Sequence, residues 1–87
     1  MYSVGYSKNA EKSLQKLNKQ ISAIIYGWID KNLVNCTDPR LYGKALTGDM
    51  KGYWRYRVGA YRIVADIQDE QIRILIINVA HRREVYL

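Results

Sequence analysis

The chain has 87 residues and a formal net charge of +6, with a pI of about 9.6. This length predicts one domain over residues 1–87 with a single core, and the basic balance favours nucleic acid or an acidic protein as partner. One cysteine, Cys36, excludes an internal disulfide. With one histidine, His81, the chain has too few ligands for a usual zinc site, so we expect no metal and no cofactor. The absence of a signal peptide and of a long apolar run favours a cytoplasmic protein without a membrane segment.

The first third of the chain predicts a strand followed by two helices. Apolar residues alternate with small ones over residues 1–6, which is the period of a strand. Ser7 is a suitable N-cap for the helix that follows it, and Asn18-Lys19 interrupts that helix. Apolar residues then recur at helical spacing over residues 21–29, which predicts a second helix. Trp28 lies on this stripe, so we expect it in the core.

The stretch of residues 53–67 alternates on both sides of Gly59-Ala60, as two antiparallel strands joined by a two-residue turn do. The predicted pairs are Val58–Tyr61, Arg57–Arg62, Tyr56–Ile63, Arg55–Val64 and Trp54–Ala65. Like charges directly opposite each other are destabilising by roughly 0.2–1 kcal/mol. Three guanidinium groups that converge on one face of a hairpin therefore indicate a site for a polyanion. The alternative is an ordinary solvated surface whose side chains splay into water.

The remaining segments complete the predicted sheet. Residues 39–52 form a connection rich in glycine and polar residues, in which Lys44 and Lys51 flank the hairpin. The apolar run 72–79 predicts a central strand covered on both faces, and the charged segment 80–87 gives the arginine site a second wall. These elements predict a small α+β domain of order β-α-α-β-β-β. In it a helical hairpin packs on one face of a mainly antiparallel four-stranded sheet.

These residue types suggest phosphoryl chemistry on RNA. Cleavage without a metal needs a deprotonated 2′-hydroxyl, stabilised charge on the phosphate oxygens and a proton for the leaving 5′-oxygen. Four arginines could stabilise the charge on the phosphate oxygens: Arg55, Arg57, Arg62 and Arg82. An arginine transfers protons poorly because its pKa stays above about 12.

Proton transfer therefore needs other groups. Histidine is the side chain whose charge ordinarily changes near neutral pH, so His81 is the natural acid or base, although a lone histidine after a strand is often a surface bystander. Tyr86 would stack on a base or serve as an acid. Glu84 would be a base or the ion-pair partner of an arginine.

Three segments resemble the RelE/ParE superfamily of bacterial toxins from type II toxin–antitoxin modules. They are Leu46-Thr47-Gly48, the hairpin of residues 52–63 and the segment 79–86. The combination of W-R-Y-R-V-G-x-Y-R with a terminal H-R-x-x-V-Y is specific, and the resemblance covers essentially the whole chain. It implies a RelE-like, ribosome-dependent endoribonuclease that cuts mRNA by metal-independent attack of the 2′-hydroxyl. It also implies an acidic, RelB-like antitoxin as partner, beside the ribosome and the mRNA.

The resemblance also assigns roles. Arg55 and Arg57 match basic residues that contact the scissile phosphate and its surroundings, and Arg62 and Arg82 match arginines that stabilise the transition state. Tyr86 matches a tyrosine that orients or stacks on the substrate nucleotide.

Some relatives carry lysine in place of the hairpin arginines, and one such lysine is a proposed base. Because arginine is a poor base, we assign the proton transfer to His81 instead. His81 stands where relatives have lysine or histidine. We expect three further cations to extend the RNA-binding surface: Lys44, Lys51 and Arg83. Two alternatives stay open, a ParE-like inhibitor of DNA gyrase and a non-catalytic basic RNA-binding module.

Overall fold

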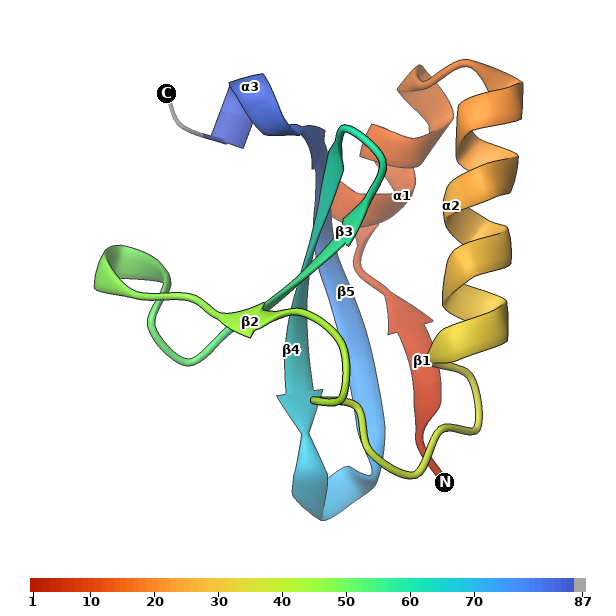
Figure 1. The fold of residues 1–87 in the computed structure, drawn as a ribbon. Coiled ribbons are helices and arrows are strands. Elements are labelled where there is room, and N and C mark those ends of the chain that lie inside the picture. The colour runs from red at the N-terminus through yellow and green to blue at the C-terminus, as the bar shows by residue number, and fades with distance from the viewer. Residues whose placement is uncertain (86–87) are drawn as a thin grey trace.

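The computed structural model describes residues 1–85, with side chains described through Arg83. It forms an α+β domain in which helices α1 and α2 pack on one face of a twisted sheet (Figure 1). The elements are β1 (Ser3–Tyr6), α1 (Lys8–Lys16), α2 (Lys19–Asn32), β2 (Lys44–Ala45), the 3₁₀ turn η1 (Gly48–Met50), β3 (Trp54–Val58), β4 (Tyr61–Gln68), the 3₁₀ turn η2 (Asp69–Gln71), β5 (Arg73–His81) and α3 (Arg82–Val85). The strand order is β1-β5-β4-β3-β2. Among the described strands, β1 and β5 form the one parallel pair. The predicted fold class is therefore confirmed.

Helix α1 begins after the predicted cap Ser7, and α2 begins at the predicted interruption, where Asn18 is a second cap. The Ser7 hydroxyl accepts a hydrogen bond from the Ala10 N–H at 3.1 Å, and the Asn18 side chain accepts one from the Gln20 N–H at 2.7 Å. Between the two caps, Leu17 is extended, with φ of −80° and ψ of 157°, which separates α1 from α2. Within residues 1–85 no helix is long and apolar enough to cross a bilayer.

The core lies between the helices and the sheet. The apolar stripe of α2 buries Ile25 and Ile29 completely, or nearly so, while Ile24 stays 63% exposed. On the sheet, Tyr56 is fully buried although its hydroxyl is polar, and that hydroxyl donates a hydrogen bond to the Pro39 carbonyl. The contact ties the loop after α2 to the centre of the core.

Two predictions about the sheet need correction. The connection over residues 39–52 contains a fifth strand, β2, which pairs with β3 through two residues only. A strand this short has no periodicity that a sequence could reveal. Strand β5 is not covered on both faces: Ile74 and Ile76 are buried, whereas Leu75 and Ile77 are only half-buried. Helices α1 and α2 cover one face of the sheet, and no comparable layer of described residues covers the other (Figure 1).

The β3–β4 hairpin has the predicted register throughout, from Val58 opposite Tyr61 to Trp54 opposite Ala65. Gly59 adopts a φ of +58°, the left-handed conformation that the first central position of this turn favours in glycine. The register and the turn together fix which side chains of the hairpin share a face.

Candidate nucleic-acid interface

Four cationic side chains lie on the sheet face opposite α1 and α2. Directly opposed residues of antiparallel strands point to the same side. Arg57 faces Arg62, and Lys44 faces Arg55 on the next strand. The intervening residues of β3, Tyr56 and Val58, point to the helices and are buried. We call the four cations the basic face: Lys44, Arg55, Arg57 and Arg62. The prediction that the hairpin arginines share one face is confirmed.

Arg62 is the most sheltered member of the basic face. Only 8% of its surface is exposed, whereas Arg57 is exposed and Arg55 half-buried. A guanidinium that is buried among neighbours has little freedom to turn away from the sheet, because its side-chain torsions are fixed by packing. Arg62 therefore presents its charge in a preorganised position, and the exposed Arg57 can move toward a ligand.

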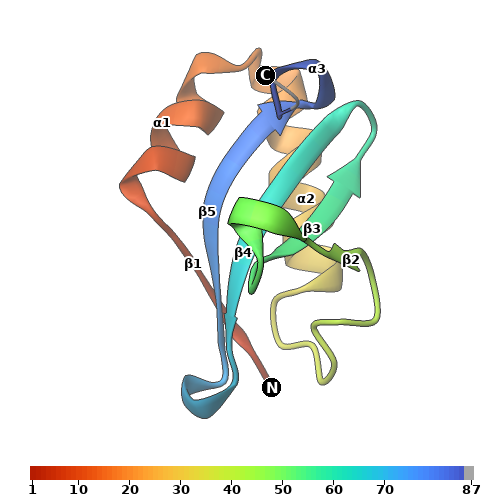
Figure 2. The same cartoon turned by 90° about the vertical axis from the view of Figure 1, so that its left-hand side faces the viewer.

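Two segments stand at the borders of this face. The connection that carries η1 stands off the sheet on the side opposite the helices, and α3 lies at the upper end of the face (Figures 1 and 2). The Arg82 N–H donates a hydrogen bond to the Ala60 carbonyl at 2.8 Å, which ties the start of α3 to the hairpin turn. Arg82 and Arg83 are exposed there, and Lys51 is exposed at the end of η1. Of the three further cations predicted to extend the surface, Lys44 thus belongs to the basic face itself, and Lys51 and Arg83 lie on segments that border it.

His81 lies elsewhere. It pairs with Tyr61, and the two rings meet edge-on with centroids 5.3 Å apart. Since Tyr61 packs against the core, the His81 ring is on the helix side of the sheet. The expectation that His81 stands beside the hairpin arginines is therefore wrong for the described structure. Alternation along β4 puts Tyr61 and Arg62 on opposite faces, so the partner of Tyr61 cannot share the arginine side.

The His81 ring has a defined contact nevertheless. Its Nδ1 accepts a hydrogen bond from the Arg83 N–H at 3.2 Å. A neutral imidazole that accepts at Nδ1 carries its proton on Nε2. The contact lies in the first turn of α3, so His81 helps to fix where that turn begins. Tyr86, the remaining predicted site residue, lies outside the described residues.

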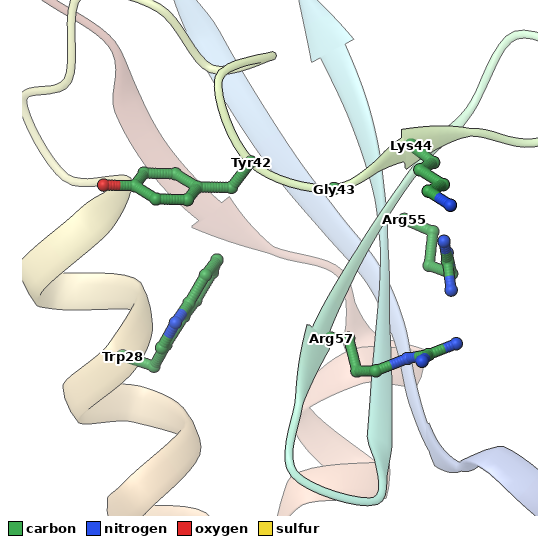
Figure 3. A pocket seen from close by; sticks show the side chains of 6 residues that line it. All are labelled: Trp28, Tyr42, Gly43, Lys44, Arg55 and Arg57. Atoms are coloured by element: carbon green, nitrogen blue, oxygen red, sulfur yellow. The ribbon is translucent and has the colours of Figure 1, made fainter.

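A pocket that the sequence did not reveal opens at the edge of β3. It has a volume of about 410 Å³ and is lined by Trp28, Tyr42, Gly43, Lys44, Arg55 and Arg57. We call it the edge pocket. Figure 3 shows the two aromatic rings on one side of the β2–β3 edge and the three cations on the other. Trp28 is only half-buried, so the prediction of a core role describes only part of its surroundings. Tyr42 lies in a connection without apolar periodicity, so no sequence pattern marked it as a site residue.

Close packing holds the loop over the edge pocket. The Trp54 Nε1–H donates to the Tyr42 carbonyl at 2.6 Å. Gly43 has a φ of +80°, and a Cβ there would lie 2.0 Å from the Arg55 carbonyl oxygen. Only glycine permits both the conformation and the approach. The position of Tyr42 therefore depends on the residue that follows it.

A polar network fastens the same loop to the β4–β5 turn. Arg40 forms a two-pronged ion pair with Asp69 at 2.9 and 3.0 Å, and the Tyr2 hydroxyl donates to the same carboxylate at 2.7 Å. The hydrogen bonds from Arg40, and then from Tyr2, lower the pKa of Asp69 to about 2. Within residues 1–85, no group of three or more histidine, cysteine, aspartate or glutamate side chains is placed to hold a metal ion.

Comparison with known proteins agrees with this geometry. The model of the family described as ParE toxin of type II toxin-antitoxin system, parDE, matches residues 4–86. Toxin RelE of Mycobacterium tuberculosis is 34% identical over 85 residues, covering 98% of this chain and 86% of that protein. Toxin RelG of the same organism is 31% identical, covering 98% and 95%. Among solved structures, the toxin–antitoxin complex RelBE2 from M. tuberculosis contains a chain that superposes with a TM-score of 0.84. That chain is 31% identical, and the match covers 93% of this chain and 91% of that one.

The matched family model spans nearly the whole chain, and the two relatives are named toxin RelE and toxin RelG. The hairpin segment on which the resemblance rests contains three of the four cations of the basic face, Arg55, Arg57 and Arg62. The chain therefore belongs to the RelE/ParE superfamily of toxins from type II toxin–antitoxin modules.

Proposed function

We propose that this toxin is an endoribonuclease that cuts mRNA on the ribosome by attack of a 2′-hydroxyl on the adjacent phosphate, without a metal. The observation that carries the proposal is the basic face: four cations in register on one side of a packed sheet. Directly opposed like charges on neighbouring strands are unfavourable for the fold. Its charge matches a phosphate backbone.

The basic face would supply the electrostatic part of the reaction. Arg55 and Arg57 would hold the scissile phosphate and its neighbour. Arg62, held by burial, would stabilise the charge that develops on the phosphate oxygens. Arg82 would add a second donor from the start of α3. Three more cations would guide the strand along the borders of the face: Lys44, Lys51 and Arg83.

The proton transfers would fall to groups other than these arginines, because a guanidinium stays protonated and is a poor proton donor or acceptor. Because the His81 ring lies on the helix side of the sheet, we propose that His81 acts as a positioning residue. It would hold the first turn of α3 through its bond from the Arg83 N–H. Tyr86 is proposed to stack on the substrate nucleotide or to give the leaving 5′-oxygen its proton.

We propose an acidic antitoxin as the neutralising partner. The RelBE2 structure shows a relative of this chain in a toxin–antitoxin complex. A formal net charge of +6 favours an acidic partner that covers the basic face and competes with RNA there. A toxin that acts on ribosomes would work in the cytoplasm.

Mapping of mRNA ends by primer extension after brief induction tests the nuclease. Breaks in phase with codons support it. The match to a ParE family model favours a second candidate, inhibition of DNA gyrase. Gyrase-linked DNA breaks with intact mRNA would establish that activity instead, and growth arrest with neither kind of break would leave a non-catalytic RNA-binding module.

A further inference from the structure

The edge pocket combines the two kinds of side chain that sites for single-stranded nucleic acid use. Trp28 and Tyr42 line one side, and Lys44, Arg55 and Arg57 line the other (Figure 3). Among the described residues its lining has three cations and no carboxylate. Proteins hold single strands by stacking bases on aromatic rings beside cations that contact the backbone. The volume of about 410 Å³ lies within the range of about 300–1,000 Å³ that is usual for ligand pockets.

The aromatic side of the edge pocket rests on the core. The centroid of the Trp28 ring lies 5.6 Å from that of Tyr56, which is fully buried. The Tyr42 ring stands at 72° to the Trp28 ring, with centroids 5.8 Å apart, and Tyr42 as a residue is 41% exposed. The buried Tyr56 ring thus supports the half-buried Trp28 ring, which in turn supports a ring that still offers surface. The two rings are already held in place. A base that stacks on them therefore costs little conformational entropy of these side chains.

The backbone of β3 adds hydrogen-bonding groups. Strand β2 pairs only with Trp54 and Arg55 of β3. The rest of β3, up to the hairpin turn, has no paired strand on this edge among the described strands. In a two-residue hairpin the closing pair, here Val58 and Tyr61, exchanges hydrogen bonds across the turn. The alternation along the strand then directs the N–H and C=O of Arg57 toward the open edge. An N–H donor beside a C=O acceptor can form two hydrogen bonds with the polar edge of a base.

We propose that the edge pocket binds one nucleotide of the message next to the one that is cut. The base would lie against Tyr42 and Trp28, and its phosphate would lie at Lys44 and Arg55. Arg55 and Arg57 belong to both the edge pocket and the basic face, so a continuous strand can occupy both. The identity of the ligand as mRNA rests on the nuclease proposed above. The edge pocket thereby gives the toxin a base preference beside the cut.

The test is a titration of the full chain with a 2′-O-methylated RNA hexanucleotide, which has no free 2′-hydroxyl and is not cut. NMR signals of the Trp28 indole and the Arg57 amide should shift with one common midpoint. Tyr42→Ala should weaken binding about fivefold or more, the effect of losing one stacked base. The matched control is Tyr26→Ala on α2, whose ring is 37% exposed and contacts Tyr6. It should leave the affinity unchanged.

The proposal is overturned if RNA shifts Arg57 while Trp28 stays unchanged, or if Tyr42→Ala binds as tightly as the parent. A glutamate-rich decapeptide with one tyrosine is the competing probe, and a Trp28 shift with this peptide but not with RNA would assign the pocket to a protein partner. Cleavage on ribosomes is measured separately with the parent chain. A Trp28 response without cleavage supports the edge pocket and removes the nuclease, whereas cleavage without a Trp28 response does the reverse.

Discussion

Arg57 lies directly opposite Arg62 across the β3–β4 hairpin, yet Arg57 is exposed whereas Arg62 keeps only 8% of its surface in contact with solvent. Two like charges in register cost about 0.2–1 kcal/mol. A carboxylate at either position would relieve that cost, and the phosphate-binding role proposed for the pair gives a reason for two cations there. In the proposed reaction the two arginines have separate tasks, because one guanidinium is held by burial and the other is exposed and would follow the substrate.

Replacing Arg57 with alanine should reduce activity without harming the fold. The substitution removes one side of the like-charge pair, so the free energy of unfolding should stay the same or rise by up to about 1 kcal/mol. The single-turnover cleavage rate on ribosomes should fall on the order of 100-fold, the usual effect of losing one transition-state donor. Arg73→Ala is the matched control, because Arg73 lies beside Gly5 and Gln68 at the other end of the sheet. Equal losses in both variants would contradict the role given to Arg57.

Arg62 and Arg82 should each be required for toxicity. Arg62→Lys keeps the charge but loses the planar fork that holds a phosphate at two points, so growth inhibition should be lost while the circular dichroism spectrum is retained. Arg82→Ala should behave in the same way. A folded Arg62→Ala, Arg82→Ala double variant that remains fully toxic would remove the nuclease proposal.

His81→Gln tests whether His81 positions α3 or transfers a proton. Glutamine does not titrate, so loss of a proton-transfer group would change the shape of the pH–rate profile. For a positioning residue, we expect the single-turnover rate to fall less than about tenfold and the profile to keep its shape. If the pH–rate profile of this variant loses its acidic or its basic limb, His81 acts as the acid or the base.

Gly43→Ala should destabilise the protein more than Gly48→Ala. Both glycines have positive φ, but only at Gly43 would a Cβ meet backbone, 2.0 Å from the Arg55 carbonyl oxygen. The left-handed conformation alone costs about 1–2 kcal/mol in a residue with a Cβ. Gly43→Ala should add the cost of moving the loop and should weaken RNA binding at the edge pocket. Urea denaturation of the two variants gives the comparison, and equal midpoints would contradict the close approach.

The ion pair between Arg40 and Asp69 should make stability depend on pH in acid. The pKa of Asp69 is lowered to about 2 in the folded chain, chiefly by the hydrogen bonds from Arg40. The carboxylate therefore stabilises the fold above the ordinary aspartate pKa of about 4, and this contribution is lost as the pH falls toward 2. Asp69→Asn should flatten the dependence of Tm on pH between these values, and added salt should weaken the effect in the parent. Asp49→Asn, on the exposed η1 turn, serves as the control. An unchanged slope in Asp69→Asn would contradict the assignment.

The hairpin and its charged face could be predicted because period and turn chemistry act over short distances. Gly59 determines the turn, the turn determines the register, and the register places Arg57 opposite Arg62. The start of α1 followed in the same way from the side-chain cap Ser7, and the break between the two helices from Asn18-Lys19. Each of these inferences needs only residues within one local segment.

The parts that could not be predicted depend on contacts between distant segments. The edge pocket exists because residues 42–43 of a loop pack on Trp54 and Arg55, and because Trp28 of α2 lies beneath them. The position of His81 follows from its pairing with Tyr61, which requires the register between β4 and β5. That register includes an irregularity between Val64 and Ala65, at which β5 contains one residue more than β4. Alternation counted along one strand cannot reveal such a step.

The most direct test of the central claim uses the purified chain, ribosomes stalled on a defined message, and mapping of the RNA 5′ ends in the presence of a metal chelator at a concentration that leaves the ribosomes intact. We predict a cut within the codon in the decoding site with the parent chain, and on the order of 100-fold less with folded Arg57→Ala. An intact message with the parent chain, or the same cut at the same rate with folded variants of Arg57 and Arg62, would contradict the claim that the basic face breaks the RNA.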